Sequence, residues 1–153
     1  MGKYRRILAL VASNGDSAAV AQRAVQLSRF YGATLALATV IDSAPRLKSN
    51  RAPVFTADEI RQARVHDMRC KLEQMMVEIG YDGGCEIIIG CGREQEVVSE
   101  LTCSWRPDLV LVSSRARHGL EQNNEHTAYD VLTVQYSRPS FPGRMINALA
   151  AAL

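Results

Sequence analysis

The residues best suited to chemistry lie in a polar loop that follows a buried apolar run, and the loop reads Ser-Ser-Arg-Ala-Arg-His-Gly over residues 113–119. Arg115, Arg117 and His118 place three potential cationic donors there, and arginine binds phosphate well through paired hydrogen bonds. Surface loops also carry solvated arginines that have no function. The loop is therefore a candidate phosphate site. The favoured interpretation is that its arginines are only solvated.

A thiol is the second candidate. Cys91 lies between two glycines, directly before a predicted helix. The positive end of that helix would favour the thiolate and make the residue redox-sensitive. A small residue that fills a tight turn explains the same pattern and is the preferred interpretation. The three histidines are interpreted as surface residues rather than ligands: His66, His118 and His126.

Signatures of catalysis do not occur in the sequence. It contains no Gly-x-Ser-x-Gly motif and no His and Cys cluster with zinc-ligand spacing. No pair of carboxylates can be assigned the roles of acid and base. We therefore expect no catalytic residue, no metal site and no enzyme activity.

Short apolar runs alternate with amphipathic stretches, which predicts that strands alternate with helices. The apolar runs have no polar face, as is typical of strands buried in a parallel sheet. The predicted strands are 7–11, 33–41, 85–89 and 109–112, and the predicted helices are about 17–31, about 57–79 and a third between 92 and 107. Thr56 can cap the second helix, after a long surface loop over residues 42–56.

This order predicts an α/β fold, a three-layer α/β/α sandwich with a five-stranded parallel sheet in the order 3-2-1-4-5. In such a sheet a ligand binds beyond the carboxyl ends of the strands, where the connections reverse direction. The first and fourth strands are neighbours at that point. The loops 12–17 and 113–119 are therefore expected to form the site.

Length and composition indicate one globular domain. The chain has 153 residues, of which 47% are hydrophobic and 22% charged, and its net charge is +2. This charge supplies no field that would favour nucleic acid or an anionic membrane. No apolar run approaches the roughly 20 residues of a membrane span. Four cysteines without a Cys-x-x-Cys pair fit free thiols in a cytoplasmic protein.

The chain resembles the universal stress protein family over nearly its whole length. The matching stretches are 7–11 with the helix that follows, 38–42, 107–112 and 128–132. The resemblance implies an adenine nucleotide alpha hydrolase-like, Rossmann-like fold. It also implies a nucleotide site, because ATP-binding members carry Gly-x-x-Gly, nine residues, and then Gly followed by Ser or Thr, which wraps backbone N–H groups around phosphates.

This chain departs from that pattern. The motif falls on Ser113, Ala116, His126 and Thr127, and of these only Thr127 matches. The acidic residue that holds the nucleoside in such members falls on Ala12, or on Ser13 if the register slips by one. Side chains in place of glycine narrow the pocket. The positions assigned to nucleotide binding by the resemblance are Ala12, Ser13, Val40, Val112, Ser113, Arg115, Ala116, Arg117, His126 and Thr127.

The end of the chain also departs from the family. If a last helix begins near Thr127, the fifth strand falls after Arg138-Pro139, where Pro142 would remove a donor from the ladder. An alternative register makes 131–135 the fifth strand and leaves almost no last helix, and it is the less favoured one. In either register the edge at which family members pair as dimers is in doubt. Residues 143–153 are expected to form a helical tail beyond a domain at 1–142.

Two functions remain open. The first is a cytosolic stress-response module without catalysis, with a degenerate ATP site, that acts as a homodimer and binds an unidentified protein partner. The alternative is an ATP-binding or adenine nucleotide-binding member with slow or no hydrolysis. No cofactor is expected in the first case, and ATP is the ligand in the second. Neither nucleic acid nor a membrane is an expected partner.

Overall fold

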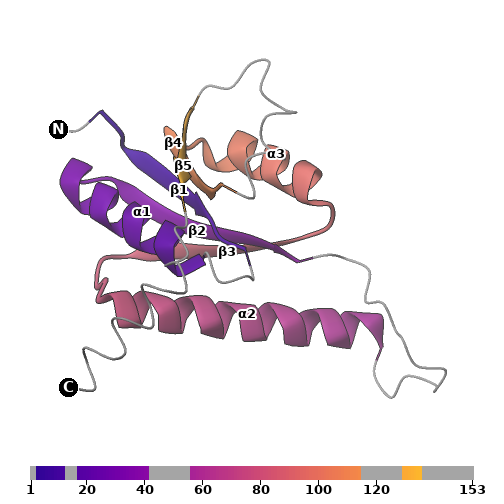
Figure 1. Ribbon diagram of the computed structural model, residues 1–153. Helices are drawn as coiled ribbons and strands as arrows, with labels where there is room; N and C mark the ends of the chain where they lie inside the picture. Colours follow the sequence, from indigo (N-terminus) through magenta and orange to yellow (C-terminus); the bar gives the residue numbers. More distant parts are fainter. Residues whose placement is uncertain (1–2, 13–16, 42–55, 115–128, 136–153) are drawn as a thin grey trace, which may run out of the picture.

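The computed structural model describes residues 3–12, 17–41, 56–114 and 129–135 (Figure 1). Its elements follow the order β1 (Arg6–Leu10), α1 (Ser17–Tyr31), β2 (Thr34–Ile41), α2 (Ala57–Ile79), β3 (Cys85–Cys91), α3 (Glu94–Trp105), β4 (Leu109–Ser113) and β5 (Asp130–Val134). The predicted tail 143–153 lies outside the described residues. Among the described helices, none has the length and apolar character that crossing a membrane requires.

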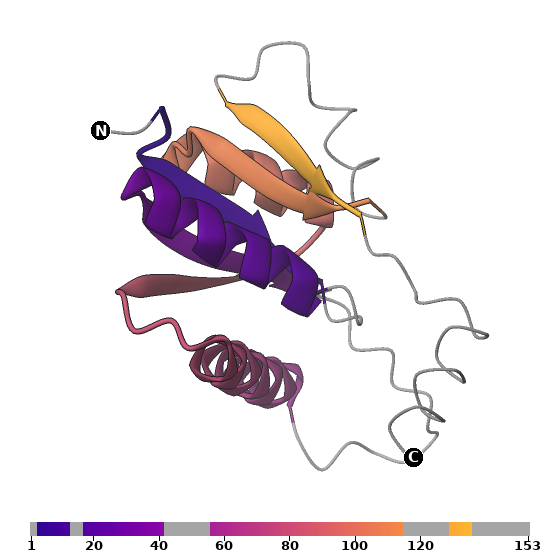
Figure 2. The ribbon, with the colours of Figure 1, turned by 60° about the vertical axis from the view of Figure 1, so that its left-hand side comes forward.

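The five strands form one parallel sheet in the order β3-β2-β1-β4-β5, which confirms the predicted topology. Helices α1 and α2 lie on one face and α3 lies on the other (Figure 2). The arrangement follows from the sequence, because strands that are apolar on both sides need a helix layer on each face.

Two cores fill the space between the layers, and alternate residues of each strand belong to different cores. The core beneath α1 and α2 contains Ile7 and Ala9 of β1, whereas Leu8 belongs to the core beneath α3. In β4, Leu109 and Leu111 face the first core, and Val110 and Val112 face the second. The second core is completed by Ala36, Ala38, Val98 and Trp105.

Local signals set the ends of α2. The Thr56 hydroxyl accepts the Glu59 N–H at 3.2 Å, and the Glu59 carboxylate accepts the Thr56 N–H at 3.2 Å. This reciprocal cap confirms the predicted start of the helix. The helix ends at Gly80, which has a φ of 80° and donates its N–H back to the last turn.

Side chains at the amino edge of the sheet join β1 to β4 and α3. The Asp108 carboxylate accepts the backbone N–H groups of Arg5 and Arg6 at 2.8 and 3.0 Å. The Arg6 guanidinium donates to the Trp105 carbonyl at 2.9 Å and lies 4.1 Å from the centre of the Trp105 ring. The indole N–H donates to Glu86 at 3.0 Å. Three elements, β1, β3 and α3, therefore meet around Trp105.

The favoured prediction for the end of the chain is wrong. Residues 130–134 are not part of a helix that packs Val131 and Leu132 inward; they form β5, paired with β4 from Leu109↔Asp130 to Ser113↔Val134. The less favoured register is therefore the correct one. Branched residues at Val131, Thr133 and Val134 favour a strand, and pairing with β4 fixes it. Pro142 lies outside the described residues.

The beginning of β5 is joined to the amino-terminal segment. The Tyr4 hydroxyl donates to the Asp130 carboxylate at 2.7 Å, and the Lys3 ammonium lies 3.4 Å from the same oxygen. The hydrogen bond from Tyr4 and the positive charge of Lys3 lower the pKa of Asp130 below its usual value. The Lys3 and Asp130 side chains are exposed, so their ion pair contributes little to stability.

Candidate functional site

The carboxyl ends of the five parallel strands lie at one edge of the sheet, and there β1 and β4 separate. Their pairing stops at Ala9↔Leu111. On its other side β1 stays joined to β2, because the Val11 N–H donates to the Ala38 carbonyl at 2.8 Å. The backbone just beyond Ala9 thus keeps its ladder hydrogen bonds to β2 where its pairing with β4 has ended.

On the other side of the opening, β4 stays paired with β5 as β1 does with β2. Its pairing with β5 continues to Ser113↔Val134, and the Ser114 N–H donates to the Val134 carbonyl at 3.1 Å. The sheet therefore opens between β1 and β4 at the point where the chain connections reverse direction. This is the position at which a parallel sheet of this type binds its ligand.

Ala12 lies at the end of β1, beside this opening, and it is exposed. Its carbonyl accepts a hydrogen bond from the hydroxyl of Ser17, the first residue of α1. The end of β1 is therefore tied to the start of α1 by backbone and hydroxyl groups. Ala12 itself presents a methyl group and no acidic side chain at this point.

The far side of the opening is formed by the end of β4. Val112 is fully buried and Ser113 is 4% exposed. Because residues alternate along a strand, Ser113 shares the face of Leu109 and Leu111, beneath α1. Its side chain thus occupies space that a glycine would leave free.

The predicted site residues fall into two groups. The structure brings Ala12, Val40, Val112 and Ser113 to the same edge of the sheet, and Val40 is half-buried on β2, in register with Gly90 of β3. The others lie outside the described residues: Ser13, Arg115, Ala116, Arg117, His126 and Thr127. His118 lies there too.

The described part of the opening carries no charge. Residues 10–12 and 40–41 are apolar, and 113–114 are both serine. Such a surface offers backbone groups and hydroxyls to an uncharged part of a ligand. It contains a potential nucleophile but no base to activate it within these residues.

The prediction that Cys91 lies directly before a helix is wrong. Cys91 is the last residue of β3, whereas α3 begins three residues later at Glu94. Its exposed thiol therefore does not lie at the first turn of a helix. Among the described cysteines, Cys85 is the half-buried one, and burial raises the pKa of its thiol.

One pair of potential ligands was missed by the sequence reasoning. His66 and Cys70 lie one turn apart on α2 and contact each other. Their spacing of four residues within an expected helix was a signal, but single histidines were treated as surface residues.

Comparisons with known proteins agree with this geometry. A family model described as the universal stress protein family matches residues 3–123. No curated protein sequence matches the chain.

Solved structures resemble the fold at low sequence identity. The universal stress protein UspA from Lactobacillus plantarum is 16% identical, with a TM-score of 0.67 over 88% of this chain and 99% of that one. A universal stress protein in complex with cAMP is 16% identical, with a TM-score of 0.59 over 86% and 96%. A family protein from Arabidopsis thaliana with AMP bound is 20% identical, with a TM-score of 0.54 over 90% and 98%.

Proposed function

The chain belongs to the universal stress protein family, and on that premise we propose that it is a cytosolic, non-catalytic stress-response module whose ATP site is degenerate. In this role it acts as a homodimer and presents its surface to a protein partner. The proposal rests on the composition of the opening between β1 and β4, because that opening is where a nucleotide would bind.

One observation carries the proposal. Ala12 has no acidic group to offer a ribose, and the buried Ser113 fills space at the position where the family motif begins with glycine. Tight phosphate binding by a backbone loop requires glycine, since the main chain must approach the phosphate closely. The two residues weaken the site from both sides of the opening.

A second function is favoured by the separation of β1 and β4. Their pairing stops at Ala9↔Leu111, so no ladder bond joins the two strands at the position where this fold binds ligands. The similar proteins described with cAMP and with AMP bind adenine nucleotides on this fold. In this alternative Arg115 and Arg117 supply charge to the phosphates in place of backbone contacts.

A fluorescent ATP analogue distinguishes the two functions. The degenerate site predicts no binding that unlabelled ATP displaces, even when the protein is at high concentration. Displaceable binding in the micromolar range would overturn the degenerate site and support the nucleotide-binding alternative. Absence of binding at millimolar nucleotide would exclude that alternative.

Restoring the family residues should create nucleotide binding. The variant Ala12→Asp, Ser113→Gly, Ala116→Gly, His126→Gly replaces each departing position. We expect its affinity for ATP to rise at least about tenfold, equal to about 1.4 kcal/mol, because a carboxylate becomes available to the ribose and backbone N–H groups gain access to phosphate. Titration calorimetry measures the change.

A matched control tests whether ATP binding requires glycine itself or only the removal of the serine and histidine side chains. It combines Ala12→Asp with Ser113→Ala and His126→Ala, so every position keeps a Cβ. This control should bind ATP no better than the Ala12→Asp single variant. If the unaltered protein already binds ATP as tightly as the restored variant, the departures from the motif do not weaken the site.

The outer edge of β5 is the surface that we propose for the homodimer. Asp130 donates its N–H to Asp108 and the Val134 carbonyl accepts from Ser114, so alternate residues from 130 to 134 direct their backbone groups toward β4. Val131 and Thr133 therefore direct theirs outward, where a second copy can pair. The described strand contains no proline that would interrupt pairing along this edge.

Thr133→Pro should abolish the dimer and leave the protomer folded. Proline removes an N–H that faces away from β4, so the β4–β5 ladder keeps its hydrogen bonds. Sedimentation velocity should show a monomer with an unchanged circular dichroism spectrum. The matched variant Leu132→Pro removes an inward N–H and should lower the thermal unfolding temperature. A Thr133→Pro protein that stays dimeric would exclude pairing through this edge.

A further inference from the structure

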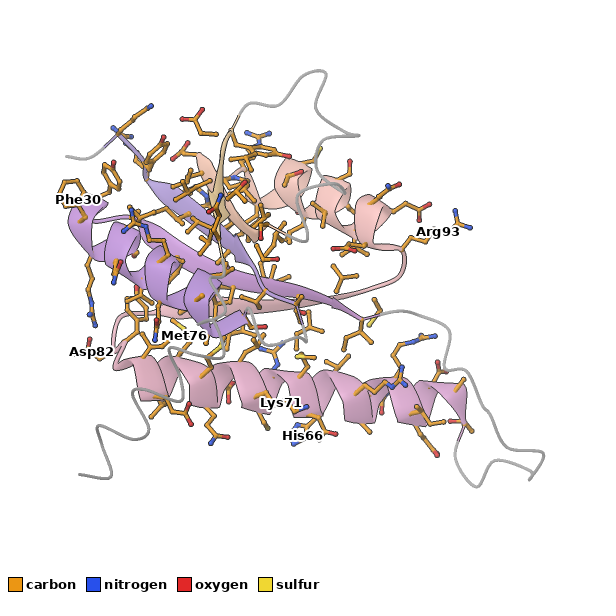
Figure 3. The ribbon with its side chains drawn as sticks, in the orientation of Figure 1. Phe30, His66, Lys71, Met76, Asp82 and Arg93 are labelled. Atoms are coloured by element: carbon orange, nitrogen blue, oxygen red, sulfur yellow. The ribbon has the colours of Figure 1, made fainter. Side chains whose placement is uncertain are left out.

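A histidine and a cysteine lie side by side on the outward face of α2. The Cys70 Sγ atom is 3.7 Å from the His66 Nε2 atom, and both residues are exposed. Leu72 and Met76 of the same helix are buried against the sheet. In Figure 3, Met76 points toward the sheet and His66 points away from it. The pair is therefore open to solvent and free of core packing.

The separation of the two atoms matches that of two ligands on one metal ion. Zinc lies about 2.3 Å from a thiolate sulfur and about 2.0–2.1 Å from an imidazole nitrogen, so a tetrahedral angle places these ligands about 3.6 Å apart. The observed 3.7 Å requires almost no movement. Two residues four apart on a helix face are held in this relation by the backbone.

The chemistry of the pair selects a class of ion. A thiolate and a neutral imidazole suit zinc, cobalt and cadmium, whereas magnesium and calcium prefer oxygen ligands. The thiol gives up its proton when the metal–sulfur bond forms, and the proton passes to solvent.

The described residues around the pair carry no net charge that would repel a cation, and they add no third ligand. The charged neighbours along the helix are Asp67, Arg69, Lys71 and Glu73, and they cancel in sum. Within the part of the chain that the structure describes, no group of three or more His, Cys, Asp or Glu residues could hold a metal. The described residues thus supply two ligands at this position.

We propose that His66 and Cys70 form a two-ligand site for Zn²⁺ and related thiophilic divalent cations, with the remaining positions filled by water. The site is accessible and exchangeable, unlike a closed structural zinc site. It lies on α2, apart from the opening between β1 and β4, so it does not depend on nucleotide binding.

Cobalt absorption tests this assignment on the full chain, kept reduced by a phosphine. We expect Co²⁺ to produce a near-ultraviolet sulfur-to-metal charge-transfer band that saturates at one ion per chain. Zn²⁺ should displace the band and Mg²⁺ should not. Cys70→Ser should abolish it, whereas Cys91→Ser and Cys103→Ser should retain it. His66→Ala should weaken cobalt binding at least about tenfold, since even changes outside the ligand shell cost that much.

Moving the histidine along the helix tests the geometry. His66→Ala with Gln74→His recreates the four-residue spacing on the other side of Cys70 and should restore binding. His66→Ala with Gln62→His has the same composition, but places the histidine two turns from Cys70, about 12 Å along the axis, and should not. No band in the unaltered protein, a band that survives Cys70→Ser, or equal binding by the two relocated variants would overturn the site.

Discussion

Replacing Trp105 with alanine is expected to lower the free energy of unfolding by about 3–5 kcal/mol. The ring is 8% exposed and belongs to the core beneath α3. Its removal leaves a cavity, and it also removes the partner of the Arg6 guanidinium, which lies 4.1 Å from the ring centre, and of the Glu86 carboxylate. Urea denaturation followed by circular dichroism measures the loss.

Conservative variants divide this effect into packing and hydrogen bonding. Trp105→Phe keeps an aromatic ring but loses the donor to Glu86, and should cost about 1 kcal/mol for that bond in addition to the change in volume. Glu86→Gln keeps an acceptor for the indole and should cost less. A loss below about 1 kcal/mol in Trp105→Ala would show that the contacts around the ring do not determine stability.

The change Gly90→Ala is expected to destabilise the protein by about 1–3 kcal/mol through overpacking. A Cβ on Gly90 would lie 2.2 Å from the Val97 Cγ1 atom, so β3 or α3 must move to admit it. Valine cannot escape by rotating, because its branched side chain has a strong preference for one rotamer in a helix. Thermal and urea unfolding measure the loss.

A double-mutant cycle with Val97→Ala isolates this contact. Removing the valine methyl groups makes room for the new Cβ, so Gly90→Ala should cost less in the Val97→Ala background. Gly84→Ala is the matched control, since a Cβ there meets nothing within 4 Å. It should leave stability unchanged or raise it slightly. Additive effects of the Gly90 and Val97 changes would contradict the predicted clash.

Most of the fold could be predicted from local patterns. The apolar runs at 7–11 and 109–112 indicated strands buried on both faces, and the structure places them side by side in the sheet. The cap at Thr56 and the left-handed Gly80 lie at the two ends of α2. These signals are local in sequence, so they need no knowledge of tertiary contacts.

The fifth strand shows where local patterns fail. The segment 130–134 contains apolar residues whose spacing suits either a short helix turn or a strand. The choice is made by pairing with β4, a contact that the segment itself does not encode. The same limit applies to Cys91, because its place at the end of β3 follows from how far that strand pairs with β2.

The candidate site was predictable in position but not in shape. The topology of a parallel sheet places Ala12 and Ser113 at one edge. The β1–β4 pairing ends early, at Ala9↔Leu111, and this depends on the strand register. The residue types along the two strands do not predict that register. The contact between His66 and Cys70, in contrast, follows from their four-residue spacing within a predicted helix.

The contacts around Trp105, Arg6 and Asp108 lie at the amino edge of the sheet, and the opening beside Ala12 lies at the carboxyl edge. In the described structure the hydrogen bonds of the amino edge involve neither Ala12 nor Ser113, so we expect substitutions at these two residues to leave those bonds in place. Such substitutions should therefore change ligand binding more than they change the free energy of unfolding.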